Sequence, residues 1–249
     1  MKALITGATS GIGREMAKIL AARGVDLIIA SRDEQRMRHI AKRLPVAVRT
    51  IAVDLSKAED CYRLYDAVKA EEIDILINNA GFGAYGATWD VPLETELNML
   101  DLNVRAVQIL TKLFLADFRK RGSGRILNVA SSAGFLAGPL MSGYYATKGY
   151  VLRLSEAISE ELRQEGSRVT VTALCPGHVE TNFDARAKDT PLHWRRFCEK
   201  SRAGRDRRDL RGKVVVLPGA LMKMTYVGEK LLPESWMLKI AYRAQARKG

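Results

Sequence analysis

The stretch TGATSGIG, residues 6–13, decides the fold that this chain is expected to adopt. It follows a short apolar run and leads into an amphipathic segment that begins near Ile12. Gly7, Gly11 and Gly13 can take backbone angles that other residues avoid, and they let a phosphate come close to the main chain. The start of the next helix presents unpaired N–H groups and the positive end of its dipole. The pattern predicts a strand, a dinucleotide-binding turn and a helix, although tight turns also use glycine for purely structural reasons.

Strand-like and helix-like segments alternate along the rest of the chain. Short β-branched runs predict strands at residues 3–6, 26–30, 47–53, 73–78, 125–130, 169–174 and 214–217. Longer amphipathic stretches predict helices at residues 12–23, 33–43, 57–71, 94–121 and 144–165. The strands are apolar throughout, which suits a parallel sheet covered on both faces. The sequence therefore predicts an α/β fold, a Rossmann-type doubly wound parallel sheet of about seven strands with helices on both faces.

The composition is that of one ordinary globular domain. The 249 residues are 47% hydrophobic and 27% charged, and they contain no internal repeat and no low-complexity linker. We expect a single domain over residues 1–249, with a basic substrate-loop segment at 184–212 and a C-terminal extension at 220–249.

Cysteine usage and the N-terminus indicate the compartment. Cys61, Cys175 and Cys198 are far apart and form no CxxC pair. This argues against a disulfide framework and against a metal site, and it favours a reducing environment. The chain begins Met-Lys and enters a strand-like run, which leaves no room for a signal peptide. The uncharged run 126–147 carries too many polar residues and helix breakers for a membrane span, so we expect a cytoplasmic protein.

The net charge of +12 suggests contact with an anionic partner, but the excess is concentrated in one place. Residues 186–213 hold eleven Lys or Arg against four Asp or Glu. This stretch has few aromatic residues and no nucleic-acid-binding motif, so we interpret it as a solvated basic loop. Contact with an acidic partner or with anionic lipid is the alternative.

The end of the second predicted strand bears on the choice of nicotinamide cofactor. In open parallel sheets, ligands bind beyond the carboxyl ends of the strands. The strand runs into IIASRDE, where Ser31 stands at the position of an acidic residue that would hold the ribose 2′-hydroxyl of NAD. Serine leaves room for a 2′-phosphate and Arg32 can pair with it, which favours NADP(H) over NAD(H). The alternative is that Arg32 is solvated and that Asp33 or Glu34 serves NAD(H).

Two further strand ends carry candidate ligand contacts. In VDL, residues 53–55, Asp54 could hydrogen-bond the adenine amino group or could cap the next helix. In NNAG, residues 78–81, the asparagine side chains can bridge loops or the cofactor, and the small residues after them leave space beside a ligand.

The stretch SGYYATKGY, residues 142–150, supplies two candidate acid/base groups. Tyr144 lies four residues before Lys148 and Tyr145 lies three before it, so each could stand near the lysine on a helix. An ammonium close to a phenol favours the phenolate and lowers a pKa of about 10. Such a phenol can exchange a proton with an alcohol or a developing alkoxide. The preceding strand end, NVASSAGF, offers serine hydroxyls to hold the same oxygen.

The motifs TGATSGIG, VDL, NNAG, LDLN, NVAS, YYATK and PGHVET occur in this order. The chain resembles the short-chain dehydrogenase/reductase family over residues 1 to about 183, and within it looks most like broad carbonyl reductases related to the DltE-type proteins. The resemblance implies Tyr144 as the acid/base and Ser131, thirteen residues earlier, as the active serine. It implies that Lys148 lowers the tyrosine pKa and binds the nicotinamide ribose. Tyr145 is then a bystander that packs beside the site.

The resemblance also implies that Asn103, in LDLN, holds a water of the proton relay. A polar residue within a long helix can otherwise simply face solvent. In PGHVET the turn after the sixth strand is expected to cover the nicotinamide, and His178 is expected to face solvent. The implied cofactor-binding residues are Gly7, Thr9, Ser10, Gly11, Ile12, Gly13, Ser31, Arg32, Asp54, Leu55, Asn79, Ala80, Gly81, Tyr144, Lys148, Pro176, Gly177, Val179 and Thr181.

The expected function is NADP(H)-dependent interconversion of a carbonyl and an alcohol by hydride transfer. An apolar small-molecule substrate is expected from the candidate pocket residues Phe82, Phe135, Leu136, Met141, Phe183 and Trp194. The resemblance also implies a homodimer or homotetramer. The alternatives are a non-catalytic NADP(H)-sensing protein on the same fold, and a binder of anionic surfaces through residues 186–213. No specific nucleic acid is expected, and peripheral membrane contact is left open for the C-terminal extension.

Overall fold

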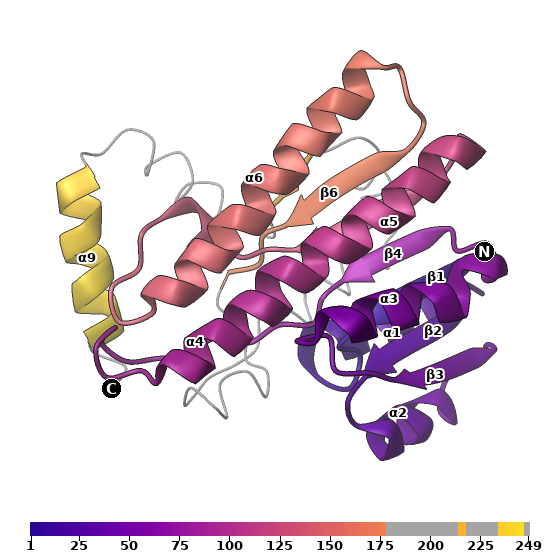
Figure 1. The fold of residues 1–249 in the computed structure, drawn as a ribbon, viewed down its shortest axis with the longest axis horizontal. Helices are drawn as coiled ribbons and strands as arrows, with labels where there is room; N and C mark the ends of the chain where they lie inside the picture. Colours follow the sequence, from indigo (N-terminus) through magenta and orange to yellow (C-terminus); the bar gives the residue numbers. More distant parts are fainter. Residues whose placement is uncertain (178–213, 218–233, 247–249) are drawn as a thin grey trace.

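The computed structural model describes residues 1–177, 214–217 and 234–246. Within these ranges, parallel strands form a seven-stranded sheet in the order β3-β2-β1-β4-β5-β6-β7 (Figure 1). The strands are β1 (Lys2–Thr6), β2 (Asp26–Ser31), β3 (Val48–Ala52), β4 (Ile75–Asn78), β5 (Arg125–Val129), β6 (Thr170–Leu174) and β7 (Val215–Val216). The order runs outward from β1 in both directions, so the predicted doubly wound fold is confirmed.

Helices cover both faces of the sheet. They are α1 (Gly11–Ala21), α2 (Glu34–Ala41), α3 (Ala58–Val68), α4 (Leu93–Leu100), α5 (Ala106–Arg121), α6 (Ser142–Gln164) and α9 (Glu234–Ala246), with short 3-10 segments η1 (Lys69–Glu71) and η3 (Ser132–Phe135). Side chains of α3, α5 and α6 share one core with the sheet, and those of α1 and α2 share the other.

Successive residues of β1 contribute their side chains to the two cores in turn. Leu4 packs in the core that contains Phe114 of α5, whereas Ile5 packs in the core that contains Met16 of α1. This alternation follows from the pleat, which points neighbouring side chains to opposite faces. A strand covered on both sides must therefore be apolar at every position, which is the pattern seen in the sequence.

The helix expected at 94–121 is interrupted. α4 and α5 are separated by η2, a π-helical segment at Asp101–Arg105. A π-helical turn inserts one extra residue into the helix and rotates the side chains that follow it, and such turns are frequent at functional sites. Asn103 lies in this segment and is buried.

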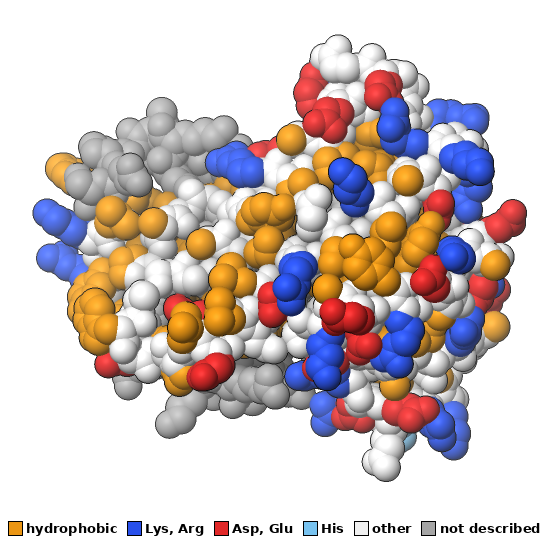
Figure 2. Space-filling view, in the orientation of Figure 1, with side chains coloured by type: hydrophobic (Ala, Val, Ile, Leu, Met, Phe, Trp, Pro, Cys, Tyr) orange, Lys and Arg blue, Asp and Glu red, His pale blue; other side chains and the backbone are white. Residues whose placement is uncertain are grey.

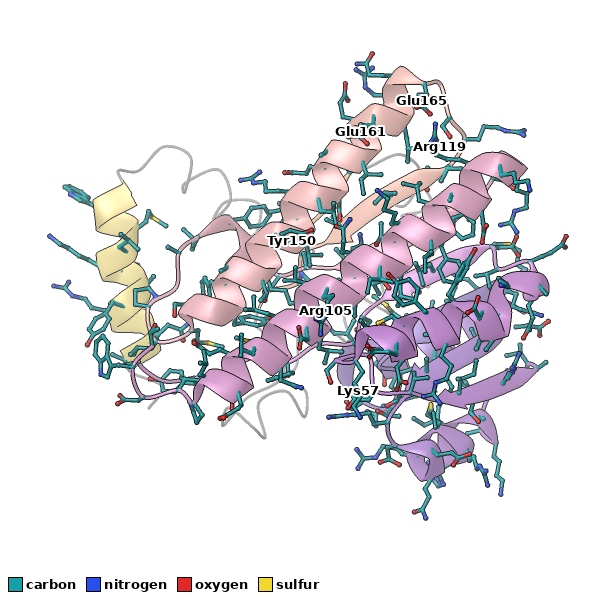
Figure 3. All side chains as sticks on the ribbon, viewed as in Figure 1. Lys57, Arg105, Arg119, Tyr150, Glu161 and Glu165 are labelled. Carbon is teal, nitrogen blue, oxygen red and sulfur yellow. The ribbon has the colours of Figure 1, made fainter. Side chains whose placement is uncertain are left out.

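α5 and α6 run side by side on the same face of the sheet (Figure 1). The Tyr150 hydroxyl donates a hydrogen bond to Gln108 Oε1 at 2.7 Å, and Arg119 and Glu165 form an ion pair of 2.7 Å at the far end (Figure 3). Both contacts are exposed, so we expect about 0–1 kcal/mol from the ion pair. The pairing of the two helices depends mainly on their buried apolar side chains.

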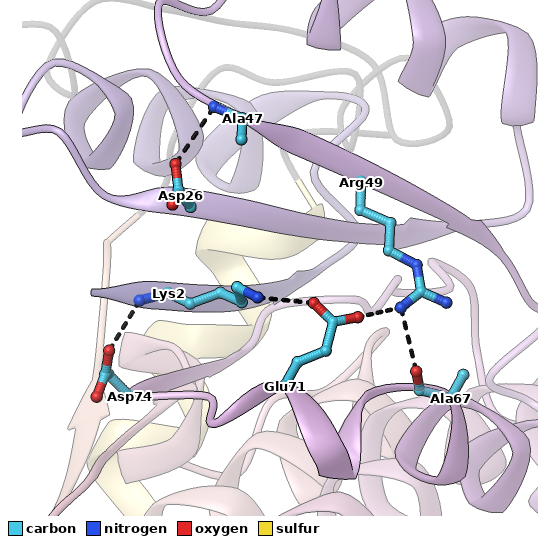
Figure 4. Close-up of polar contacts among 7 residues, drawn as sticks. All are labelled: Lys2, Asp26, Ala47, Arg49, Ala67, Glu71 and Asp74. Carbon is cyan, nitrogen blue, oxygen red and sulfur yellow. Dashed lines mark hydrogen bonds and ion pairs between the residues drawn. The ribbon is translucent and has the colours of Figure 1, made fainter.

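A polar network fastens the amino-terminal edge of the sheet (Figure 4). The Lys2 main-chain N–H donates to Asp74 Oδ2 at 2.8 Å, and the Lys2 ammonium donates to Glu71 at the same distance. Arg49 of β3 also donates to Glu71 and, at 3.2 Å, to the Ala67 carbonyl. The Lys2 hydrogen bond holds the pKa of Glu71 below its ordinary value. These contacts lie at the amino-terminal ends of the strands, away from the carboxyl ends where ligands bind. We therefore expect them to contribute to stability and not to the candidate site.

The C-terminal extension contains one described helix, α9, at one end of the long axis of the molecule (Figure 1). The basic segment 186–213 lies outside the described residues. None of the helices in the described ranges is long and apolar enough to cross a membrane.

Candidate active site

The glycine turn after β1 is shaped by its contact with the end of β4. Gly7 and Gly11 have φ angles of +68° and +52°, which favour glycine. A methyl group on Gly7 would stand 2.8 Å from Ala80 Cα. The Asn79 amide donates to the carbonyls of Thr6 and Gly7, both at 3.0 Å. The predicted bridging role of Asn79 is therefore visible within the protein, and it fixes the turn beside the sheet edge.

The start of α1 has the properties of a phosphate site. Ser10 is the N-cap residue, yet its side chain makes no capping hydrogen bond, and the first turn contains no acidic residue. The N–H groups of that turn and the positive end of the helix dipole are thus available to an anion. This arrangement fits the pyrophosphate of a dinucleotide at Gly11, Ile12 and Gly13.

At the end of β2, both acidic alternatives are engaged within α2. The Asp33 carboxylate accepts a hydrogen bond from the Arg36 N–H at 2.8 Å and caps the helix. Glu34 pairs with Arg38 at 2.7 Å. Arg32 is exposed and makes no ion pair within the described part of the chain.

Ser31 connects this strand end to the glycine turn. Its hydroxyl lies 3.4 Å from that of Thr9. The two predicted cofactor residues therefore meet at the junction of β2 and the turn.

The Asp54 carboxylate makes its hydrogen bonds to Ser56 and does not cap the following helix. Its Oδ1 accepts hydrogen bonds from the Ser56 N–H at 3.2 Å and from the Ser56 hydroxyl at 2.8 Å. The N-cap of α3 is Lys57, so the helix-capping alternative is wrong. The carboxylate instead stabilises a tight turn two residues on, a common use of aspartate. Leu55, beside it, is buried.

Ser131 is held at the end of β5 by the backbone that follows. It is extended, and its Oγ accepts a hydrogen bond from the Ala133 N–H at 3.1 Å, which caps η3. The neighbouring Ser132 N–H donates to the Pro176 carbonyl at 2.8 Å. This hydrogen bond joins the loop that follows β5 to the loop that follows β6.

Lys148 of α6 is a buried cation. Its side chain is nearly inaccessible, and its ammonium donates a hydrogen bond to the Val129 carbonyl at 2.8 Å. Nζ lies 5.8 Å from the centre of the Tyr144 ring, within the range of a cation–π contact. Burial lowers the pKa of Lys148 from 10.5 to about 8. A charged amine that is shielded from water stabilises a negative charge on a neighbouring group, such as a phenolate.

Asn103 is 1% exposed and links three segments. Its side chain exchanges two hydrogen bonds with the backbone of Phe82, at 3.1 and 2.8 Å. Its Nδ2 also donates to Thr147 Oγ1 at 3.1 Å, and the Thr147 hydroxyl donates to the Tyr144 carbonyl at 2.7 Å. The solvent-facing alternative for Asn103 is wrong, because the π-helical turn directs the amide inward.

Gly81 lies where these groups meet. A methyl group on it would stand 2.8 Å from Asn103 Oδ1 and 3.6 Å from Lys148 Nζ. The end of β4, the π-helical turn and α6 therefore converge on one point. The predicted residues Gly81, Asn103 and Lys148 are brought together there, with Tyr144 one helical turn from the lysine.

Tyr145 points to a different partner. Its ring packs edge-on to that of Tyr144 with centroids 6.2 Å apart. Its hydroxyl accepts a hydrogen bond from Gln245 Nε2 of α9 at 2.8 Å, and the Gln245 carbonyl accepts one from the Tyr85 hydroxyl at 3.0 Å. Burial raises the pKa of Tyr145. This phenol therefore holds the C-terminal helix and is kept protonated.

An apolar pocket of about 460 Å³ adjoins Tyr145. It is lined by residues 134–139 around η3, by Tyr145 and Gly149 of α6 and by Leu238 of α9. Phe135 and Leu136 belong to this lining, whereas Phe82, Met141 and the candidate catalytic residues Ser131 and Tyr144 do not.

Several predicted residues cannot be placed. His178, Val179, Thr181, Phe183 and Trp194 lie outside the described residues. In the described ranges, no group of three or more His, Cys, Asp and Glu is arranged to hold a metal ion.

The sequence reasoning missed three supporting residues. Thr6 Oγ1 accepts hydrogen bonds from the N–H groups of Asn79 and Ala80, at 2.9 and 3.0 Å. Thr147 connects Asn103 to Tyr144, and Gln245 holds Tyr145. The sequence could have indicated Thr6, because it is a polar residue at the end of an otherwise apolar strand. Gln245 had none, because its partner is 100 residues away in the chain.

Comparisons with known proteins show the family of this chain. The family model for short chain dehydrogenases matches residues 1–191. An uncharacterized oxidoreductase of Staphylococcus saprophyticus is 34% identical over 185 residues, which are 72% of this chain and 78% of that protein. A short-chain dehydrogenase from Sphingobium yanoikuyae in complex with NADPH has a TM-score of 0.81 and 29% identity, covering 95% of this chain and 94% of that one. A short-chain dehydrogenase/reductase from Burkholderia phymatum in complex with NAD has a TM-score of 0.76 and 26% identity, covering 91% of each chain.

Proposed function

Because the chain belongs to the short-chain dehydrogenase family, we propose that it is an NADP(H)-dependent oxidoreductase that interconverts a carbonyl and an alcohol. The observation that carries this proposal is the convergence of Gly81, Asn103 and Lys148 beside Tyr144. A buried ammonium, a phenol and a fixed amide at the carboxyl edge of a parallel sheet form a proton-transfer site next to a dinucleotide turn.

The residues that would hold the cofactor lie along the carboxyl ends of β1, β2 and β4. The N–H groups at the start of α1 would bind its pyrophosphate, and the small residues Ala80 and Gly81 would leave room for the nicotinamide half. When bound, the nicotinamide donates or accepts the hydride. Asn79 keeps the turn in the shape that receives it.

The preference for NADP(H) is supported by the engagement of Asp33 and Glu34 in α2. A carboxylate that caps a helix is a poor partner for a ribose hydroxyl, since turning toward the ribose would leave the Arg36 N–H unpaired. Arg32 is exposed beside Ser31 and is suited to a 2′-phosphate. The relatives with bound cofactors include one with NADPH and one with NAD, so this choice depends on the residues of this chain.

In the reductive direction, Tyr144 gives its phenolic proton to the developing alkoxide oxygen of the substrate. The Ser131 hydroxyl donates a hydrogen bond to the same oxygen and holds the substrate in line. Lys148 remains largely protonated at neutral pH, because its pKa is about 8, and its charge favours the phenolate that is left. Asn103 and Thr147 fix the first turn of α6 and so position the tyrosine.

Other features suit an apolar carbonyl substrate and a self-associating protein. The pocket beside Tyr145 is apolar. Leu93, Leu97 and Leu100 form an exposed stripe at helical spacing on α4, which we propose pairs with a second copy in a homodimer or homotetramer. The free, buried thiols of Cys61 and Cys175 suit a reducing compartment such as the cytoplasm.

The experiment is nicotinamide absorbance with NADPH and NADH in parallel, over a panel of ketones, aldehydes and quinones. Ser131→Ala is paired with Ser132→Ala as the matched control. We expect carbonyl-dependent oxidation of NADPH in the wild type and in Ser132→Ala, and a loss of about 100-fold in Ser131→Ala. No turnover of any carbonyl, despite binding of NADPH, would overturn the reductase and favour a nucleotide-sensing role.

A further inference from the structure

The outward face of α9 combines large apolar side chains with cations. Trp236 and Ile240 are 62% and 54% exposed. Lys239 and Arg243 are exposed on the same helix. Figure 2 shows hydrophobic and basic side chains side by side along the edge of the molecule that α9 forms. Apolar side chains that gather with cations on one exposed helix face are typical of a surface that contacts a partner.

The spacing divides the helix into two faces. Trp236, Ile240 and Arg243 follow one another at intervals of four and three residues, so they share one side of the helix. The opposite side is occupied by Leu238, which lines the apolar pocket, and by Gln245, which is 6% exposed. The helix therefore packs on the rest of the protein through its opposite side, and the apolar side chains of the outer face are not needed for that packing.

The inner face holds α9 in a defined orientation. Gln245 hydrogen-bonds Tyr145 through its side chain and Tyr85 through its carbonyl. α9 lies at one end of the long axis, away from α2 and α3 (Figure 1). Its outer face therefore projects from the end of the molecule, where a flat surface could approach it.

We propose that the outer face of α9, defined by Trp236, Lys239, Ile240 and Arg243, docks on an anionic lipid bilayer. Tryptophan prefers the boundary between water and acyl chains, where its ring is buried and its N–H stays hydrated. Lysine and arginine beside it meet lipid phosphates. The outer-face side chains that the structure describes include no acidic group, and the chain as a whole carries +12.

A second copy of this chain is a poorer occupant of the same face. Pairing about a two-fold axis sets the same patch against itself. Lys239 and Arg243 of both copies would then meet across the interface, and like charges in a desolvated contact are unfavourable. An anionic lipid surface neutralises these cations and also receives the apolar side chains.

The contact is expected to be reversible. A few interfacial side chains and two cations give weak, composition-dependent binding rather than permanent anchoring. Binding should therefore require anionic lipid and should weaken in high salt.

The test is flotation of the full-length protein with vesicles of phosphatidylcholine, with and without phosphatidylserine. Trp236→Ser/Ile240→Ser removes the apolar part of the face, and Lys239→Gln/Arg243→Gln removes the cations. Tyr62→Ser on α3 is the matched control for an exposed aromatic. Lys42→Gln/Lys120→Gln is the control for the loss of two exposed cations elsewhere.

Wild type and both controls are expected to float with phosphatidylserine vesicles and to stay in solution with phosphatidylcholine alone. The apolar variant is expected to lose at least about 10-fold in partition coefficient. The charge variant should lose about 5-fold for each cation removed. Circular dichroism and gel filtration of each variant check that the fold and the oligomer are retained.

Three outcomes would overturn the proposal. The first is a wild-type protein that does not float with either vesicle. The second is equal flotation of the wild type and both α9 variants, which would move the binding to residues 186–213. The third is an α9 variant that changes the sedimentation mass without changing flotation, which would make this face an interface between copies. Flotation is measured without substrate or cofactor, so its result is independent of the proposed reductase activity.

Discussion

The ammonium nitrogen of Lys148 lies 5.8 Å from the centre of the Tyr144 ring and donates its hydrogen bond to the Val129 carbonyl at 2.8 Å. The lysine thus stands over the ring of the phenol and is anchored to the end of β5. A charge in this position acts on the phenol through space, and the sheet, rather than the phenol, fixes where the charge sits. The cost of burying that charge appears in the lowered pKa of the lysine.

Lys148→Met is expected to make the cofactor-free protein more stable and to abolish most of its activity. Replacing a buried charge by an apolar chain of similar length should raise the free energy of unfolding near neutral pH by about 1–3 kcal/mol. The loss of the charge next to Tyr144 should lower kcat by at least about 100-fold. Denaturant titration and NADPH oxidation measure the two effects.

The stability difference should depend on pH. The pKa of Lys148 is 10.5 when exposed and about 8 in the folded protein, so between these values the unfolded chain binds more protons. Wild-type stability from this group therefore rises with pH across that window, and the advantage of Lys148→Met shrinks. Cys61, Cys175 and Tyr65 also titrate at high pH, but they are present in both proteins and cancel to first order. A difference that stays constant from pH 8 to 10.5 would contradict the burial of a charged lysine.

Thr147→Val should impair catalysis without touching the reacting atoms. It removes the hydroxyl that accepts from Asn103 and donates to the Tyr144 carbonyl. We expect a stability loss of about 1–2 kcal/mol and a decrease in kcat of about 10-fold, with KM for NADPH little changed. Thr147→Ser keeps the hydroxyl and should restore kcat. If Thr147→Ser is as slow as Thr147→Val, the chain of hydrogen bonds does not position the tyrosine.

Arg32→Ala should weaken NADPH while leaving NADH unaffected. The loss of one guanidinium from a 2′-phosphate is expected to raise KM for NADPH by about 10- to 100-fold. Arg38→Ala, on the exposed side of α2, removes a cation of the same type and should change neither cofactor. Equal effects of Arg32→Ala on both cofactors would end the argument for NADP(H).

Two glycines that face each other across the η3–α6 contact should respond in opposite ways to alanine. A methyl on Gly134 would meet the Lys148 carbonyl oxygen at 2.6 Å and its carbon at 2.9 Å, which are backbone atoms that cannot move easily. Gly134→Ala should therefore cost about 2–3 kcal/mol. A methyl on Gly149 would meet nothing closer than 3.6 Å, and Gly149→Ala should add about 0.5–1 kcal/mol through helix propensity. Thermal unfolding of the two variants gives the comparison, and equal destabilisation would contradict the close packing of η3 on α6.

The strands and the glycine turn could be predicted because local pattern and tertiary demand coincide there. A strand such as β1 is apolar at every position because both of its faces are covered, and this is readable without any partner. The turn at Gly7 could be predicted for a similar reason. Its positive φ favours glycine, whatever the fold of the rest of the chain. The ends of the helices could also be predicted to within a few residues, because they too depend on the local sequence.

The parts that could not be predicted depend on distant contacts. The π-helical turn that buries Asn103 carries no distinctive composition, and its inward rotation is stabilised by Phe82 and Thr147 from other segments. From its local sequence, Asp54 could either form a turn with Ser56, as the structure shows, or cap the next helix. The contact between Gln245 and Tyr145 exists only after α9 has packed on α6.

We propose that Tyr144, and not its neighbour Tyr145, carries the proton, and a matched pair of variants distinguishes the two phenols. The measurement is kcat for NADPH-dependent carbonyl reduction in the wild type, Tyr144→Phe and Tyr145→Phe. We expect kcat to fall by at least about 100-fold in Tyr144→Phe. Tyr145→Phe should lose less than about 10-fold, because it removes only the hydrogen bond to Gln245. The reverse order, with Tyr144→Phe active and Tyr145→Phe inactive, would contradict the account.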